Sequence, residues 1–235
     1  MKKYLFIALG ALLCFAVGCA GPGPLVPASE PTPESAPEPT PESTPEPTPE
    51  TQEDVPPPDI ITGSIVMEDG GVITFELYPD IAPQSVRNFV YLARQGFYDG
   101  LTFHRIMTGF MIQGGRSRDG EGGGPGYSIF GEFADNGFEN NLGHTRGVMS
   151  MARLGHDFNS ASSQFFICHA DRGGDLDGKY AAFGMVTSGM DVVDRIAETP
   201  VIDDNGTVLP EDMPVISTIT IDGDFELPEP DKLPR

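Results

Sequence analysis

Basic residues are scarce in this chain, which has 14 Lys and Arg against 35 Asp and Glu and a formal net charge of −21. A protein this acidic is repelled by the phosphates of nucleic acids and by the anionic headgroups of a membrane. The composition therefore argues against a nucleic-acid partner and against direct contact between the folded domain and a membrane surface.

Long apolar runs are also lacking. The N-terminal run Tyr4–Val17 is shorter than the roughly 20 residues that a transmembrane helix needs. It follows Met1-Lys2-Lys3, and a charged start before a short apolar stretch is typical of a secretory signal peptide. We therefore predict that residues 1–18 are a signal peptide and that the protein is extracytoplasmic.

Cysteine is the third scarce residue, with three copies. The segment Ala16–Cys19 resembles a bacterial lipobox, although Leu is commoner at the position of Ala16. This resemblance implies that Cys19 is lipidated and that the lipid alone attaches the protein to the cell membrane or envelope. The alternative is simple cleavage. Cys14 would leave with the signal peptide, so we expect Cys168 to be an unpaired, buried, small hydrophobic residue.

Residues 19–58 are rich in Pro, Glu and Thr, with near-repeats at eight-residue spacing over 31–34, 39–42 and 47–50. Frequent Pro favours polyproline II, and regularly spaced Glu side chains repel one another. We therefore predict a disordered stalk that reaches on the order of 120 Å if fully extended. A Pro-rich ligand for a partner domain is the alternative, although nothing basic flanks these prolines.

A folded domain is predicted over residues 59–224, with a C-terminal tail over 225–235. Two β-rich runs, 60–67 and 72–78, are separated by a Gly-containing turn, which predicts a hairpin. Pro83 stands at a first helical position, and the apolar residues after it recur at three-and-four spacing, so a helix is predicted over 83–95.

A second helix is predicted before Pro200. Ser188 and Asp191 stand at the spacing of a capping box, which would begin this helix. Residues 215–221 alternate between apolar and polar and predict a closing strand. Many short strands with two helices indicate an all-β barrel with helical caps.

The segment Phe103–Gly115 places one arginine, one amide and several apolar side chains within thirteen residues. It predicts an active-site strand pair. About fifty residues later, strand alternation over Ser163–Ile167 puts Gln164 and Phe166 on one face. Together the two segments predict an apolar pocket rimmed by amide and guanidinium donors.

Four segments, 96–105, 109–115, 162–167 and 176–184, occur in the order and at the spacing of one family. Over about residues 62–222 the chain resembles the cyclophilin-type peptidyl-prolyl cis/trans isomerases. The resemblance implies a closed eight-stranded antiparallel β-barrel capped by two α-helices. It also implies catalysed rotation of Xaa-Pro bonds, here in exported proteins, without a cofactor.

The resemblance assigns roles to ten residues. Arg105 would donate to the prolyl nitrogen, Gln113 would hold a substrate carbonyl, and Gln164 and the backbone around Ala152 would contact the residue before proline. Five side chains would enclose the proline ring: Phe110, Met111, Phe166, Leu176 and Tyr180. Strand alternation places Phe110 opposite Met111, so its assignment depends on the resemblance and on barrel twist. His104 is either a substrate contact or a structural histidine.

The absence of tryptophan is one of several departures from the family. Eukaryotic members have Trp at the position of Asp175, so the resemblance implies weak cyclosporin binding here. Arg153 and Thr108 replace the Asn and Pro of many members, so the resemblance implies a different peptide preference. Tyr180 replaces a His of eukaryotic members and keeps a flat apolar wall with a polar tip.

Metal chemistry is not expected, because His144, His156 and His169 lack a ligand spacing. The segment Asp203–Gly206 lacks the distal Glu of a calcium loop and is predicted to be a tight turn. We expect a monomeric enzyme whose partners are proline-containing polypeptides. The alternative is a non-catalytic module or scaffold that binds proline peptides at the cell surface.

Overall fold

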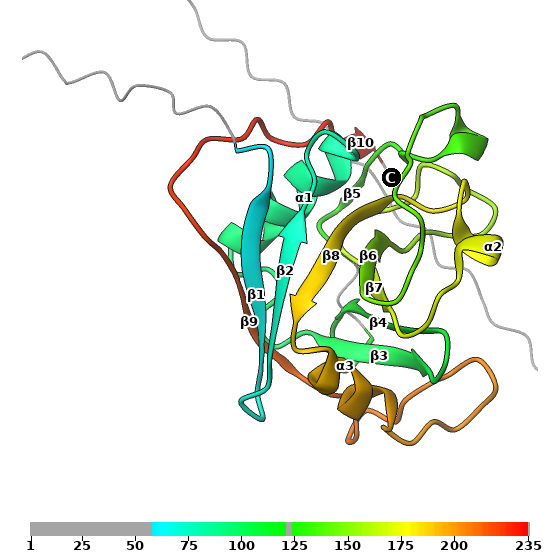
Figure 1. Ribbon diagram of the computed structural model, residues 1–235. Coiled ribbons are helices and arrows are strands. Elements are labelled where there is room, and N and C mark those ends of the chain that lie inside the picture. The colour runs from blue at the N-terminus through cyan, green and yellow to red at the C-terminus, as the bar shows by residue number, and fades with distance from the viewer. Residues whose placement is uncertain (1–57, 121–123, 235) are drawn as a thin grey trace, which may run out of the picture. The chain divides into compact units, whose positions relative to one another are not determined.

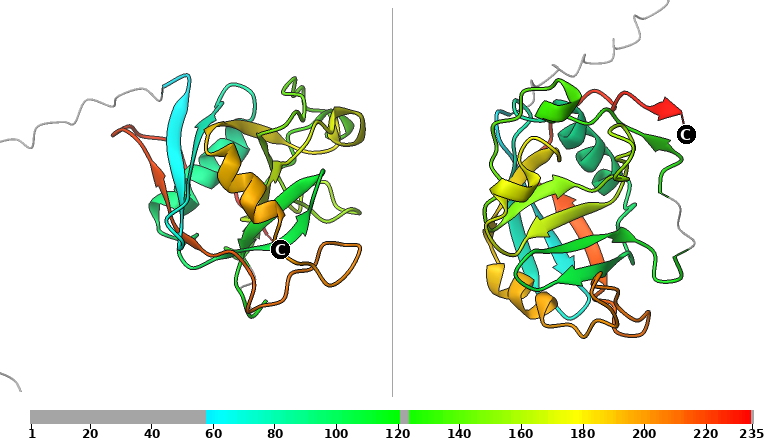
Figure 2. Two further views of the ribbon diagram at one scale, coloured as in Figure 1. Left: turned by 60° about the horizontal axis from the view of Figure 1, so that its bottom comes forward. Right: turned by 90° about the vertical axis from the view of Figure 1, so that its right-hand side faces the viewer.

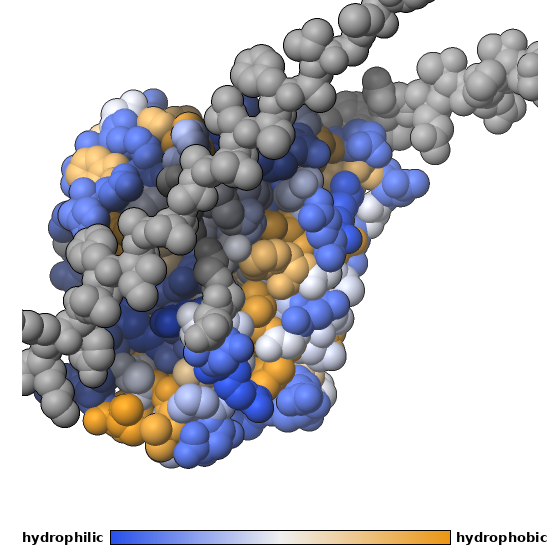
Figure 3. Space-filling model, turned by 180° about the vertical axis from the view of Figure 1, so that it is seen from behind, coloured by the Kyte–Doolittle hydropathy of each residue, from blue (hydrophilic) through white to orange (hydrophobic). Residues whose placement is uncertain are grey.

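The computed structural model describes residues 58–120 and 124–234. The predicted signal peptide, the predicted lipidation site Cys19 and nearly all of the predicted stalk lie outside these residues. Within the described part of the chain, no helix is both long and apolar enough to cross a membrane. The face in Figure 3 is mainly hydrophilic, with smaller apolar areas between the polar ones.

Eight antiparallel strands form one strongly curled sheet in the order β3-β4-β7-β6-β8-β2-β1-β9 (Figure 1). Helices α1 and α3 lie at its two ends (Figure 2). The strands are β1 (Ile61–Met67), β2 (Val72–Leu77), β3 (Thr102–Met107), β4 (Met111–Arg116), β6 (Val148–Met151), β7 (Phe165–Cys168), β8 (Ala182–Ser188) and β9 (Ile216–Ile221). The helices are α1 (Pro83–Arg94), α2 (Gly173–Leu176), α3 (Met190–Ala197) and a 3-10 turn, η1 (Ala134–Asn136).

The two end strands of the sheet, β3 and β9, come together without forming a continuous ladder. Thr102 and Val215 make an isolated bridge, and the Phe103 amide donates to the Pro214 carbonyl at 2.9 Å. The predicted β-rich fold with helical caps is thus observed as a curled sheet, in which the end strands β3 and β9 meet at an isolated bridge and the predicted closed ladder does not form among the described residues.

Helix α1 fills one open end of the curled sheet with the apolar stripe that its sequence predicts. Val86, Phe89, Val90 and Ala93 are all buried. The Phe89 ring lies 5.2–5.8 Å from four other aromatic rings, those of Phe75, Tyr98, Phe165 and Phe183. Burial of one such ring contributes about 1.5–3 kcal/mol, so this aromatic cluster holds the helix to the sheet.

The predicted capping box of α3 is wrong. Ser188 is still the last residue of β8, and Gly189, with φ of 85°, takes the N-cap position without a side-chain cap. A Cβ at Gly189 would lie 2.2 Å from the Val72 carbonyl oxygen. The close approach of β2 therefore requires glycine there, whereas the helix itself is confirmed.

The C-terminal residues pack back onto the domain. Phe225 is buried, and the short strand β10 (Leu233–Pro234) pairs with β5 (Tyr127–Ser128) in a second, two-stranded sheet. Figure 2 shows this pair beside α1. Residues 225–234 of the predicted tail therefore form an ordered segment across the surface of the domain, which we call the C-terminal strap.

Candidate active site

Arg105, Gln113 and Phe166 lie in one row across three neighbouring strands. In the strand register Arg105 of β3 stands opposite Gln113 of β4, and Gln113 stands opposite Phe166 of β7. Side chains paired in this way share a face of the sheet and lie within contact distance. The structure thus brings together the three residues on which the predicted pocket depends.

The Arg105 guanidinium is held on several sides. Its Nε donates to the Asn205 carbonyl oxygen at 2.8 Å and lies 3.3 Å from Asn205 Oδ1. Its Nη1 donates to Gln113 Oε1 at 3.3 Å, and its Nη2 lies 3.1 Å from Met107 Sδ. Asn205 therefore fixes the Nε edge of the guanidinium, and the two Nη atoms point toward Gln113 and the methionine sulfurs.

The tight turn that supplies Asn205 is organised by Asp203. The Asp203 carboxylate accepts hydrogen bonds from the Asn205 amide at 3.1 Å, the Thr207 amide at 3.0 Å and the Thr207 hydroxyl at 2.8 Å. The bonds from Thr207 lower the pKa of Asp203. The turn itself was predicted, but its role behind Arg105 was not, because a hundred residues separate the two in sequence.

An apolar cluster separate from the main core lies beside this row. Met111, Phe166 and Leu176 are buried in it, and Phe110, Tyr180 and Ala152 pack against it partly buried. The Tyr180 ring meets the Phe166 ring edge-on, with centroids 5.7 Å apart. Phe110 joins this cluster despite the alternation rule because it lies in the turn before β4, where strand alternation does not apply.

Two amide side chains continue the polar rim. Gln113 Nε2 donates to Gln164 Oε1 at 2.9 Å, and the Ala152 amide donates to the Gln164 carbonyl at 2.9 Å. These three residues line an open cavity of about 740 Å³. The residues predicted for the site therefore lie along the apolar cluster or its amide rim.

His104 lies beside Arg105 and the same amide rim. With Arg105 and Gln113 it lines a second cavity of about 470 Å³. Burial, together with the positive charge of Arg116, lowers the pKa of His104 from 6.5 to about 4. Its buried Nδ1 has no hydrogen-bond partner among the described residues. His104 is therefore a neutral imidazole at the edge of the site.

Comparison with known proteins identifies the family in which this arrangement of residues occurs. A family model described as cyclophilin type peptidyl-prolyl cis-trans isomerase/CLD matches residues 62–221. The chain belongs to this family. It is 44% identical over 150 residues to peptidyl-prolyl cis-trans isomerase B of Bacillus subtilis, covering 64% of this chain and 95% of that one. A peptidyl-prolyl cis-trans isomerase of Helicobacter pylori is 44% identical over 135 residues, covering 57% and 78%.

Solved structures of the family have the same fold. A crystal structure of a cyclophilin type peptidyl-prolyl cis-trans isomerase from Cryptosporidium parvum matches with a TM-score of 0.60 and 29% identity, covering 70% of this chain and 99% of that one. The same enzyme crystallised in the presence of the dipeptide Ala-Pro matches with a TM-score of 0.59 and 28% identity, covering 69% and 99%.

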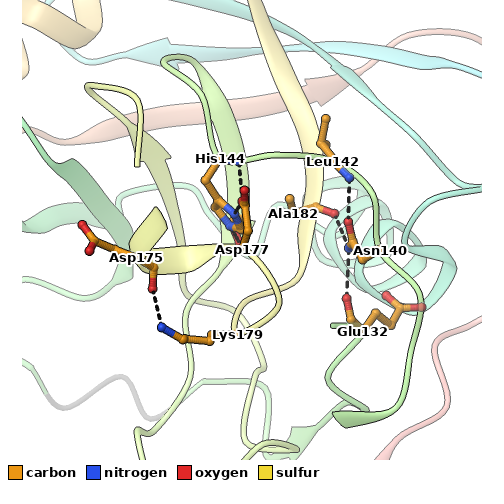
Figure 4. Close-up of polar contacts among 9 residues, drawn as sticks. Glu132, Asn140, Leu142, His144, Asp175, Asp177, Lys179 and Ala182 are labelled. Carbon is orange, nitrogen blue, oxygen red and sulfur yellow. Dashed lines mark hydrogen bonds and ion pairs between the residues drawn. The ribbon is translucent and has the colours of Figure 1, made fainter. Parts of the chain in front are cut away.

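The buried His144 ring stacks on the Phe166 ring and belongs to a hydrogen-bonded group that the sequence did not predict; Figure 4 shows its contact with the exposed Asp177. His144 Nδ1 lies 2.8 Å from Asp177 Oδ1, and His144 Nε2 lies 3.0 Å from Ser150 Oγ. Burial lowers the pKa of His144, so the neutral ring donates to Asp177 and accepts from Ser150. Ser150 is completely buried. The three residues therefore support the pocket and do not act as a nucleophile relay.

Three residues at which this cyclophilin differs from the family pattern make defined contacts in the structure. The Arg153 guanidinium lies 4.7–5.0 Å from the rings of Phe133, Phe158 and Tyr180. Thr108 Oγ1 donates to the Ala197 carbonyl at 2.7 Å and ties the β3–β4 turn to α3. Asp175 is exposed and pairs with Arg172 at 3.0 Å.

Two further expectations concern cysteine and metal. Cys168 is buried, as predicted, and burial raises the pKa of its thiol to about 12. Among residues 58–120 and 124–234, no three His, Cys, Asp or Glu side chains gather in an arrangement that could hold a metal ion.

Proposed function

We propose that this peptidyl-prolyl cis-trans isomerase accelerates the rotation of Xaa-Pro bonds in exported polypeptides, with Arg105 donating to the prolyl nitrogen. The observation that carries the proposal is the cross-strand row in which Arg105 and Gln113 stand beside Phe166. A proline ring seated in the apolar cluster would bring its nitrogen toward the guanidinium.

The uncatalysed barrier to this rotation, about 18–20 kcal/mol, comes from amide resonance. In the twisted transition state the prolyl nitrogen regains its lone pair and accepts a hydrogen bond that the planar amide cannot accept. A donor aimed at that nitrogen therefore binds the transition state better than the ground state, which lowers the barrier.

Arg105 suits this role because a guanidinium stays charged at any relevant pH and donates in a fixed plane. The carbonyl and side chain of Asn205 hold its Nε edge, so little reorganisation is needed when a substrate binds. Gln113, which already contacts Arg105 and Gln164, would offer its amide to a substrate carbonyl. No proton transfer is required at any step.

The purified full chain in detergent tests this proposal through cis-to-trans conversion of a short Xaa-Pro peptide. Arg105→Ala should lower kcat/KM by about 10²-fold, the typical cost of one transition-state donor. Arg195→Ala, which breaks an exposed ion pair with Asp69, is the matched control and should retain activity. Equal conversion by wild type, Arg105→Ala and buffer would refute the proposal, and peptide binding without acceleration would favour a binding module.

We further propose a lipid anchor on Cys19 and an extracytoplasmic, monomeric enzyme carried on a stalk. The sequence pattern of residues 1–19 supports the anchor. Intact mass of the protein extracted from bacterial membranes should exceed the mass of residues 19–235 by a lipid, and Cys19→Ala should abolish the increment and the membrane association. A soluble wild-type protein with an unmodified Cys19 would contradict it. Light scattering of the detergent-solubilised protein tests the monomer.

A further inference from the structure

The C-terminal strap, residues 225–234, is fixed to the domain at several points. Arg94 lies over the buried Phe225 ring at 4.3 Å and donates to the Phe225 carbonyl at 2.9 Å. The Asp231 amide and carboxylate both bond the Gln84 side chain, at 2.8 and 2.6 Å. Lys232 lies 4.5 Å from the Tyr91 ring. The strap therefore has one defined course along α1.

This course ends at the groove of the candidate active site. Leu233 and Pro234 pair with Ser128 and Tyr127 of β5, and Pro234 lines the cavity of about 740 Å³ that Gln113, Ala152 and Gln164 also line. The strap, at the C-terminal end of the folded domain, thus lines the same cavity as the amide rim beside Arg105.

We propose that the strap forms a wall of the peptide groove and selects an apolar side chain two or three residues before the proline. The inference rests on the proposed function, since it takes the apolar cluster around Phe166 as the seat of the proline ring. Gln164 and Ala152 then face the residue before proline, and the cavity beyond them receives the residues that precede it.

Distances along an extended peptide agree with this placement. Each residue advances the chain by about 3.3 Å, so the second and third residues before proline lie about 7–10 Å from it. That segment would leave the amide rim and enter the cavity where Pro234 stands. A dipeptide substrate would not extend far enough to contact the strap.

The choice of an apolar side chain follows from Leu154 and Pro234, two apolar residues among the mainly polar residues that line this cavity. Leu154 is 57% exposed and lines the cavity together with Pro234, so both offer apolar surface that a bound side chain would cover. The two guanidinium groups on the lining each donate to a backbone carbonyl of the domain. Arg116 donates to the Gly120 carbonyl at 3.2 Å, and Arg153 donates to the Lys179 carbonyl at 2.9 Å.

The strap can be altered without touching the residues proposed for catalysis. Deletion of residues 231–235 removes the part that reaches the groove and keeps the buried Phe225 anchor. Pro234→Ala is the finer change, and Pro228→Ala is its matched control, because Pro228 is an exposed proline of the same strap that does not line the cavity.

The test compares three peptides with the same Xaa-Pro core in the full-length protein. One begins at the residue before proline, and two are extended by three residues, with Leu or Asp two positions before the proline. Deletion of 231–235 should lower kcat/KM for the Leu peptide about fivefold, in the range that small apolar pockets provide. It should leave the short peptide within about twofold. Pro234→Ala should follow the deletion in part, and Pro228→Ala should match wild type.

Each other result overturns the inference. Equal losses on the short and long peptides would mean that the strap only stabilises the fold, and no loss on either would mean that it does not contact substrate. A stronger effect on the Asp peptide would replace the apolar selection with a charge selection. Wild-type turnover of the short peptide tests the proposed function separately. If that fails, the affinity of a Trp-labelled long peptide still tests the strap, since the chain has no Trp.

Discussion

The His144 ring stacks on the Phe166 ring, with centroids 6.0 Å apart and 18° between their planes. Phe166 is the floor of the proposed proline pocket, and His144 is itself fixed by Asp177 and Ser150. The position of the pocket floor is thus determined by a histidine that is buried, and that a substrate would therefore not touch.

His144→Ala should destabilise the protein by about 2–4 kcal/mol, because it leaves a cavity and two polar partners without their bonds. Urea unfolding at pH 7.5 measures this. The loosened Phe166 should also raise KM for a short Xaa-Pro peptide more than it lowers kcat. His156→Ala, a change at an exposed histidine, is the control. An unchanged KM in a folded His144→Ala protein would show that the stacking does not position the ring.

A second prediction concerns pH. The pKa of His104 is about 4 in the folded protein, lowered by burial and by Arg116, against an unfolded value of 6.5. Between these values the unfolded state binds a proton that the folded state does not. The contribution of His104 is therefore complete above pH 6.5 and is lost as the pH falls toward 4, by at most about 3 kcal/mol.

His104→Gln tests this pH dependence because glutamine does not titrate. The free energy of unfolding of the variant should fall less than that of wild type between pH 7 and pH 4.5. Parallel curves for His104→Gln and wild type would mean that His104 is protonated in the folded state.

Several parts of this site could be predicted from the sequence, because the residues concerned lie close together along the chain. Arg105 and Gln113 share a hairpin, and alternation alone puts Gln164 and Phe166 on one face. Leu176 and Tyr180 depended on the family resemblance, since no periodicity connects their loop with the pocket.

The parts that could not be predicted depend on contacts between distant segments. Asn205 supports Arg105 across a hundred residues, and nothing in an Asn-Gly turn signals that contact. His144 was considered only as a metal ligand, because its neighbours Asp177 and Ser150 come from other elements. The C-terminal residues 225–234 contain few apolar residues, so no sequence pattern predicts that they pack against the groove.

A third prediction follows from Asp175, which stands where eukaryotic relatives carry tryptophan. Asp175 is exposed and makes one ion pair with Arg172. Asp175→Trp should therefore be tolerated, and the added aromatic surface should strengthen cyclosporin binding by about tenfold. Turnover of a short peptide should stay within about twofold of wild type. Inhibition curves measure both, with Asp175→Ala as the control for loss of the ion pair. Equal cyclosporin inhibition of the Trp and Ala variants would assign the family difference to another position.

The last prediction separates the backbone of the Asn205 turn from its side chain. Asn205→Ala removes the longer contact to Arg105, 3.3 Å from Oδ1, and keeps the carbonyl bond at 2.8 Å. Activity should fall about twofold or less. Gly206→Ala is different, because Gly206 has φ of 81° and a Cβ there would lie 2.2 Å from the Ile106 carbonyl oxygen.

The clash at Gly206 should push the turn away from β3 and release the guanidinium edge, so kcat should fall about tenfold, in keeping with the sensitivity of catalysis to misplacement. The Ile106 amide, which donates to the Gly206 carbonyl at 2.8 Å, should lose protection from hydrogen exchange. Gly223→Ala, also at positive φ but just beyond the C-terminal end of β9, controls for glycine strain in general. If Gly206→Ala and Gly223→Ala reduce kcat equally, the turn does not hold Arg105 in its working position.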